Sequence, residues 1–127
     1  MHNLPQQHAI LRIMARPSDV NIAGDVFGGW LMSQCDIAGA IVATRRAGGR
    51  VVTVSVKEFL FLQPVLVGDI VSIYAKEKKL GNSSISIDID VYIERRNDTG
   101  EHIQHVAQAE IVYVHIDHTR RPTPITP

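Results

Sequence analysis

The residues best suited to chemistry lie in the stretch 21–36, which reads NIAGDVFGGWLMSQCD. Two glycines, Gly28 and Gly29, open an apolar segment, and one acid, Asp36, follows seven residues later. A carboxylate in such a segment has three interpretations. It is a catalytic base, a surface charge on a solvated helix face, or a buried acid that is held by a structural partner.

The spacing around Asp36 predicts a helix from about residue 28 to residue 46, which ends before Gly48 and Gly49. One face of this helix is an apolar stripe of Leu31, Cys35, Ala38 and Val42, widened by Trp30, Ile37 and Ile41. The opposite face carries Asp36 among the small residues Gly29, Ser33 and Ala40. Because a solvated face normally carries Lys, Glu and Arg, this pattern weakens the surface-charge interpretation.

After the helix, the hydrophobic period changes from 3.6 to 2, which indicates strands. We expect strands at about residues 8–15, 51–62, 69–80, 85–93 and 103–117. Turn residues at 67–69, 81–83 and 97–100 are short connections that favour antiparallel neighbours. The predicted fold class is α+β, with a strongly bent antiparallel β-sheet wrapped around one long central helix.

Length and composition predict a single domain over residues 1–127, with short flexible ends at about 1–7 and 119–127. Thirteen Lys and Arg balance thirteen Asp and Glu, so global charge does not favour a nucleic-acid or membrane partner. One cysteine excludes an intrachain disulfide framework, and the N-terminus lacks the apolar core of a secretory signal. No apolar run approaches the roughly 20 residues of a membrane span. We therefore expect a soluble, cytoplasmic protein.

Four segments together resemble a known family: MARPSDVNIAGDVFGGWLMSQCD, GRVVTVSV, FLQPVLVGD and LGNSSISIDIDVYIE. The first contains N-x-x-G-[DN]-x-x-G-G followed by an acid, which is similar to the motif of hotdog-fold acyl-CoA thioesterases. The chain most resembles YciA-type acyl-CoA hydrolases, from about residue 11 to residue 125. This resemblance implies a hotdog fold that hydrolyses acyl-CoA to a free carboxylic acid and coenzyme A. Coenzyme A is then part of the substrate, and no other cofactor is expected.

Thioester hydrolysis needs a water made nucleophilic and donors aimed at the oxygen that becomes negative. An ionised Asp36 can orient and deprotonate water, and the amide of Asn21 can hold that water or the carbonyl. By resemblance, Asn21 and Asp36 correspond to the family's catalytic pair. The backbone N–H groups of Gly28 and Gly29 open the helix and are the predicted oxyanion site. Asp25 is interpreted as a supporting residue, with a purely structural role in its loop as the alternative.

The coenzyme A moiety needs donors for its phosphates. The turn Gly81, Asn82, Ser83 and Ser84 resembles the family's G-R-S-S turn near the nucleotide, with Asn82 in the basic position. We expect Arg120 to compensate, with Arg121, Lys76 and Lys78 as further candidates and plain surface charge as the alternative.

The resemblance also implies an assembly. Hotdog thioesterases pair two sheets edge to edge, and each active site takes a loop from one subunit and the helix from the other. YciA-type members are commonly trimers of such dimers. We therefore expect a homo-oligomer, at least a dimer with shared active sites, and a hexamer as the complete assembly.

Other chemistry is less well supported by the sequence. Cys35 lies on the apolar stripe and is interpreted as a core residue, while His115 and His118 are interpreted as solvated, so no metal is predicted. A hotdog dehydratase would need a catalytic histidine, and none lies between His8 and His102. The remaining alternative is a noncatalytic acyl-CoA-binding hotdog protein. Such a sensor would normally carry a DNA-binding module, for which this chain has no room.

Overall fold

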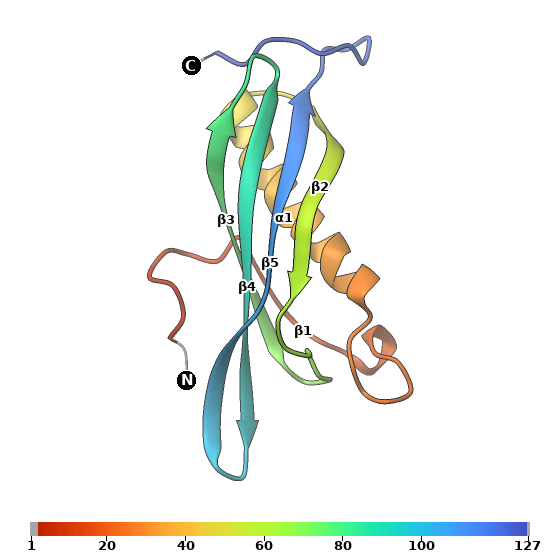
Figure 1. The fold of residues 1–127 in the computed structure, drawn as a ribbon, viewed down its shortest axis with the longest axis vertical. Helices are drawn as coiled ribbons and strands as arrows, with labels where there is room; N and C mark the ends of the chain where they lie inside the picture. Colours follow the sequence, from red (N-terminus) through yellow and green to blue (C-terminus); the bar gives the residue numbers. More distant parts are fainter. Residues whose placement is uncertain (1–2, 127) are drawn as a thin grey trace.

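A computed structural model describes residues 3–126, in which one long helix lies across one face of a five-stranded antiparallel sheet (Figure 1). The elements in chain order are β1 (Leu11–Met14), a short 3-10 helix (Pro17–Asp19), α1 (Gly28–Ala47), β2 (Val51–Phe61), β3 (Ile70–Leu80), β4 (Ser84–Asn97) and β5 (Gly100–His115). The first strand is shorter than the predicted strand 8–15. Strands β4 and β5 pair along almost their whole length and form a long hairpin.

Helix α1 confirms the predicted helix almost to the residue. It ends where Gly48 adopts a left-handed conformation (φ 72°) and donates its N–H to the carbonyl of Thr44. Leu31, Cys35 and Ala38 are buried, as the predicted stripe requires. Ile37 is 48% exposed, so its assignment to the buried face is wrong. Within the described chain, no helix is both long enough and apolar enough to cross a membrane.

The order of strands across the sheet is β1-β3-β4-β5-β2. The predicted antiparallel neighbours at 81–83 and 97–100 are confirmed, because β3 pairs with β4 and β4 with β5. The prediction that the turn at 67–69 joins neighbouring strands is wrong, since β2 pairs with β5 at one edge and β3 lies on the other side of β4. The connection after β2 is long enough to cross the sheet, and its residue Leu62 still donates to the carbonyl of Val106 on β5.

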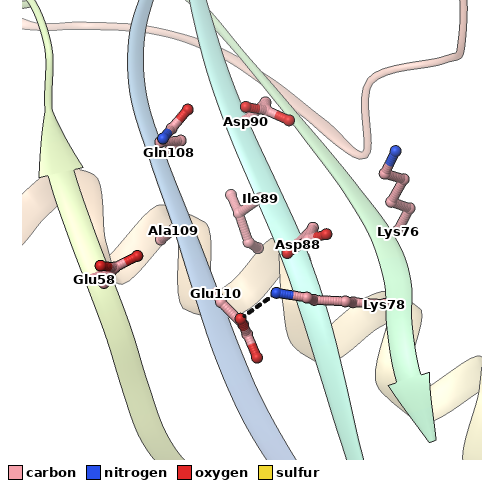
Figure 2. Close-up of a pocket in the computed structure, with 9 residues that line it drawn as sticks. All are labelled: Glu58, Lys76, Lys78, Asp88, Ile89, Asp90, Gln108, Ala109 and Glu110. Carbon is pink, nitrogen blue, oxygen red and sulfur yellow. Dashed lines mark hydrogen bonds and ion pairs between the residues drawn. The ribbon is translucent and has the colours of Figure 1, made fainter.

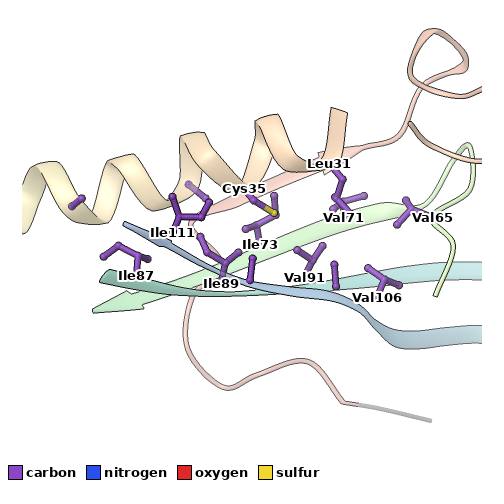
Figure 3. Close-up of a cluster of buried hydrophobic side chains, with 14 of the residues drawn as sticks. Leu31, Cys35, Val65, Val71, Ile73, Ile87, Ile89, Val91, Val106 and Ile111 are labelled. Atoms are coloured by element: carbon purple, nitrogen blue, oxygen red, sulfur yellow. The ribbon is translucent and has the colours of Figure 1, made fainter. Parts of the chain in front are cut away.

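The core lies between α1 and the sheet (Figure 3). Every second residue of β4 points into it, and these side chains are fully or almost fully buried: Ile85, Ile87, Ile89, Val91 and Ile93. Leu31 and Cys35 of α1 pack against them. Each large apolar side chain buried in this way contributes about 1.5–3 kcal/mol. This packing holds α1 against the sheet, and Asp36 is therefore held with it.

The C-terminal segment makes defined contacts with the body of the protein. Thr123 donates its N–H to the carbonyl of His115 at 2.9 Å, Ile125 donates to Asn82 at 2.7 Å, and the Ile125 side chain is buried. The flexibility expected for residues 119–127 stays a prediction. Motion of this segment would have to break these hydrogen bonds. Residues 1, 2 and 127 of the predicted flexible ends lie outside the described residues.

A buried ion pair anchors the connection between β2 and β3. Arg95 on β4 reaches both carboxylate oxygens of Asp69 at 2.8 and 2.7 Å, and Asp69 is 1% exposed. The same carboxylate accepts the N–H of Leu66, whose backbone forms a bridge with Asp25. The ion pair therefore supports the loop that precedes α1, which carries Asn21.

Replacing Arg95 with alanine should lower the free energy of unfolding by about 3–5 kcal/mol, because the buried Asp69 carboxylate loses its charged partner. The neighbouring Arg96 is the matched control. It is exposed and lies 3.6 Å from Glu101, so Arg96→Ala should cost only about 0–1 kcal/mol. Urea denaturation at one fixed protein concentration measures the free energy of unfolding of both variants. Equal losses would contradict a special role for the buried pair.

Candidate active site

Asp36 lies within α1 and is held by hydroxyl groups from two strands. Thr53 Oγ1 on β2 donates to Asp36 Oδ1 at 2.6 Å, and the Tyr113 hydroxyl on β5 donates to the Asp36 backbone carbonyl at 2.7 Å. Asp36 is half-buried. The hydrogen bond from Thr53 argues against a freely solvated surface charge, and a base and a structurally held acid are both compatible with this geometry.

Sequence reasoning did not identify Thr53. It lies in the segment GRVVTVSV, where threonine is an ordinary strand residue. Its hydrogen bond leaves Asp36 Oδ2 available for a second partner, and an ionised carboxylate accepts through both oxygens. The arrangement therefore fits a carboxylate that is oriented through one oxygen and can accept a proton through the other.

Asn21 lies in an exposed loop between Val20 and Val26, which form an isolated β-bridge. Its side-chain oxygen accepts the N–H groups of Ala23 at 2.9 Å and Asp25 at 3.2 Å. Its own backbone N–H donates to the carbonyl of Asp25 at 2.8 Å. The backbone of Asp25 therefore holds the loop. The Asn21 side chain accepts these bonds through its oxygen, so its NH₂ donors remain available for a ligand.

Gly28 and Gly29 are the first two residues of α1, after Phe27, which provides no side-chain cap. The N–H groups at this end lack intrahelical acceptors and lie at the positive end of the helix dipole. Gly28 packs against Phe61 so closely that a Cβ there would lie 3.2 Å from the ring, whereas the space at Gly29 is open. An apolar pocket of about 360 Å³ adjoins Gly28.

The predicted coenzyme A residues lie on the β3–β4 turn and the C-terminal segment, at the end of the molecule opposite the Asn21 loop (Figure 1). Within the turn, Gly81 donates its N–H to Ser84 at 2.7 Å, and the Ser83 carbonyl accepts the N–H of His115. Asn82 and Arg120 are exposed. A single chain therefore brings Asp36 to Thr53 and Asn21 to Asp25, while the predicted nucleotide residues form a separate group.

Cys35 is fully buried in the core, which confirms the sequence interpretation. Burial, and secondly the neighbouring Asp36 charge, raise the pKa of its thiol to about 12. The residue is therefore a neutral thiol at physiological pH and a poor nucleophile.

His115 is half-buried, with its ring against Gly49 and its Nδ1 3.2 Å from the Pro124 carbonyl oxygen, so its solvation stays a prediction. Among residues 3–126, no group of three or more His, Cys, Asp or Glu side chains is placed to hold a metal ion. That the reaction needs no metal stays a prediction.

A second hollow lies on the sheet face away from α1 (Figure 2). It has a volume of about 330 Å³ and is lined by charged side chains of both signs, among them Lys76, Asp88 and Glu110. Lys78 crosses it to form an ion pair with Glu110 at 2.8 Å. Its four acids, Glu58, Asp88, Asp90 and Glu110, outnumber its two lysines, so its lining is polar and acidic, unlike the apolar pocket beside Gly28.

Comparison with known proteins identifies the family. A family model described as the thioesterase superfamily matches residues 23–99. The acyl-CoA thioester hydrolase YciA of Salmonella typhimurium is 46% identical over 98% of this chain and 95% of its own length. The chain belongs to the thioesterase superfamily, among the YciA-type acyl-CoA thioester hydrolases.

Solved structures agree with this assignment. A hexameric hotdog-fold thioesterase of Campylobacter jejuni superposes with a TM-score of 0.90 at 40% identity, over 94% of this chain and 91% of that one. The predicted hotdog fold is therefore confirmed. An acyl-CoA hydrolase of Staphylococcus aureus in complex with butyryl coenzyme A gives a TM-score of 0.83 at 29% identity, over 91% and 69% of the two chains. Three further structures of that hydrolase carry alanine in place of an asparagine, an aspartate and a threonine.

The environment of Cys35 leads to a chemical prediction. In the native protein, a thiol-reactive disulfide reagent at pH 8 should modify Cys35 at least about a hundredfold more slowly than in the unfolded chain, because thiolate is scarce and access is blocked. Absorbance of the released thiolate follows the reaction, and unfolding in guanidinium provides the control. Rapid stoichiometric labelling of folded protein would contradict the buried, neutral state.

Proposed function

We propose that this protein hydrolyses acyl-CoA thioesters, with Asp36 as the carboxylate that orients and deprotonates the attacking water. The observation that carries this proposal is the half-buried Asp36, which is fixed by Thr53 through one oxygen and has the other available. Its support comes from a relative named acyl-CoA thioester hydrolase that aligns over nearly the whole chain.

In this mechanism, Asp36 takes a proton from water as the water oxygen forms a bond with the thioester carbonyl carbon. The N–H groups at Gly28 and Gly29 stabilise the oxyanion that develops on the carbonyl oxygen. When the carbon–sulfur bond breaks, the proton held by Asp36 passes to the departing thiolate. The products are a free carboxylic acid and coenzyme A, and Asp36 is again ionised.

Each active site in this proposal is shared by two chains, because Asn21 and Asp36 have separate partners within one chain. Strand β2 lies at the edge of the sheet and exposes the apolar residues Val54, Val56 and Leu60. An exposed apolar edge strand is a ready surface for pairing with another copy. We propose that two chains pair along β2, so that Asn21 of one completes the site around Asp36 of the other.

The Staphylococcus aureus structures support the same set of residues. The asparagine, aspartate and threonine replaced there are separated along that chain by the same numbers of residues as Asn21, Asp36 and Thr53 here. This spacing supports a joint role for the three residues. The hexameric state of the Campylobacter jejuni protein supports a trimer of dimers as the complete assembly of this chain.

The nucleotide of coenzyme A belongs, in this proposal, to the β3–β4 turn and Arg120. The exposure of Asn82 and Arg120 at one end of the molecule supports this placement. In a pair of antiparallel β2 strands, this end of one chain lies beside the opposite end of its partner. We also propose a cytoplasmic location, which is consistent with a single free cysteine.

The proposed role of Asp36 predicts the effect of Asp36→Asn. This change keeps the volume of the side chain but removes the proton acceptor, so kcat should fall roughly a hundredfold or more while the oligomer is retained. Asp98→Asn, at the exposed β4–β5 turn, is the matched control and should be silent. Steady-state kinetics with butyryl-CoA and light scattering provide the measurements.

Near-normal turnover of Asp36→Asn would rule out Asp36 as the base. Binding of butyryl-CoA by the unchanged protein without any turnover would instead favour the noncatalytic acyl-CoA-binding alternative. Loss of assembly in that variant, with intact folding of Asp98→Asn, would instead assign Asp36 a structural role.

The shared site predicts complementation between two defective chains. Asn21→Ala loses positioning but not the proton acceptor, so it should be less impaired than Asp36→Asn. When the two variants are unfolded, mixed and reassembled, one of the two sites in each mixed dimer receives both intact residues from different chains. Activity should then exceed the mean of the two parents. Activity equal to that mean, with mixed dimers present by native mass spectrometry, would place each site within one chain.

A further inference from the structure

Asp36 is contacted by a cross-strand pair of hydroxyl side chains. Thr53 on β2 and Tyr113 on β5 are directly opposite each other in the β2–β5 register. Thr53 donates to the Asp36 carboxylate at 2.6 Å, and Tyr113 donates to the Asp36 main-chain carbonyl at 2.7 Å. The register of β2 shifts immediately after Thr53, and such bulges commonly redirect side chains near active sites. One side chain thus holds the carboxylate and the other holds the backbone of the same residue.

The approach of Tyr113 to α1 depends on Gly39, which lies one helical turn after Asp36. A Cβ at Gly39 would overlap the Tyr113 hydroxyl and lie 2.9 Å from its Cζ. Glycine in the interior of a helix weakens the helix relative to alanine. The close passage of Tyr113 beneath the helix is the structural reason for a glycine at this position.

Tyr113 is suited to be a permanent donor. Its side chain is 0% exposed, and burial, followed by the neighbouring Asp36 charge, raises the pKa of the phenol well above its usual value. The hydroxyl therefore keeps its proton throughout the range in which an enzyme operates. The acceptor is the Asp36 carbonyl, so the bond acts on the position of the helix backbone.

Apolar contacts alone do not fix the height and rotation of a helix on a sheet, because dispersion is nondirectional and small residues permit sliding. The helix residues that pack on the sheet near Asp36 are small: Cys35, Ala38, Gly39 and Ala43. A directional hydrogen bond supplies the missing constraint. An error of about 1 Å in the position of a catalytic group can cost a hundredfold in rate.

We propose that Tyr113, with Gly39, is a positioning element for the reaction: it fixes the backbone of Asp36 relative to the sheet, so that the carboxylate meets Thr53 and the attacking water in one geometry. This proposal rests on the proposed function of Asp36 as the base. Tyr113 itself does not touch the reacting atoms.

Tyr113→Phe tests this role, because it removes only the hydroxyl. We expect kcat for butyryl-CoA to fall roughly tenfold while KM changes less than about twofold, since substrate contacts are retained. Tyr74→Phe is the matched control. Tyr74 is also a buried tyrosine, but it lies on the sheet face away from α1. A loss of kcat that reflects only general destabilisation would therefore also appear in Tyr74→Phe.

A double-mutant cycle separates positioning from a general structural role. In the Asp36→Asn background there is no base to position, so adding Tyr113→Phe should leave the residual kcat unchanged within about twofold. A further tenfold loss in that background, or near-normal kcat of Tyr113→Phe alone, would overturn the positioning role. If Asp36→Asn retained normal turnover, the proposed function itself would fail, which is a different result.

Gly39→Ala provides an independent route to the same test. The added methyl group displaces the Tyr113 hydroxyl without removing it, so kcat should again fall with KM retained. Light scattering and thermal melting identify variants that do not assemble. If Tyr113→Phe does not assemble, an assembled Gly39→Ala protein with wild-type kcat would overturn the proposal. If neither assembles, the hydroxyl contact serves stability and the positioning role is rejected.

Discussion

The contact of the β5 residue Tyr113 with Gly39 and the Asp36 carbonyl of α1 is the physical constraint on which the candidate site depends. The buried residues of α1 after Leu31 are small, namely Cys35, Ala38, Gly39 and Ala43, and Gly39 leaves room for the Tyr113 side chain of β5. The large side chains of β4 fill the space on the sheet side, so that packing density is retained. The same small residues bring the Asp36 backbone within reach of Tyr113 and its carboxylate within reach of Thr53.

The loop that carries Asn21 is held in a different way. The loop is held by a backbone hydrogen bond from Asn21 to Asp25 and by the bridge between Asp25 and Leu66. Leu66 in turn is bound by Asp69, which forms the buried ion pair with Arg95. Charge burial therefore supports one half of the proposed site, while close packing supports the other. In the proposed dimer, the apolar edge of β2 brings these two halves together from different chains.

Local patterns predicted the elements well because their causes are local. The helix has glycines at both ends and a 3.6-residue period between them, and β4 alternates apolar and polar residues along its length. The long-range pairing of β2 with β5 was not predicted, because a turn sequence at 67–69 describes a change of direction and not which strand is the neighbour. Ile37 was misassigned for a related reason, since periodicity cannot tell how much of an apolar helix surface one sheet covers.

The amino-acid sequence by itself determined the helix and most strand positions, because periodicity records local geometry directly. Its resemblance to YciA-type hydrolases supplied the family and the choice of Asn21 and Asp36. Only the tertiary structure decided that Thr53 and Tyr113 hold Asp36 and that Gly39 makes room for this contact. A threonine or tyrosine in a strand, or a glycine in a helix, fits many environments equally well. Their partners lie far along the chain, and folding of α1 onto the β2–β5 pair brings them together.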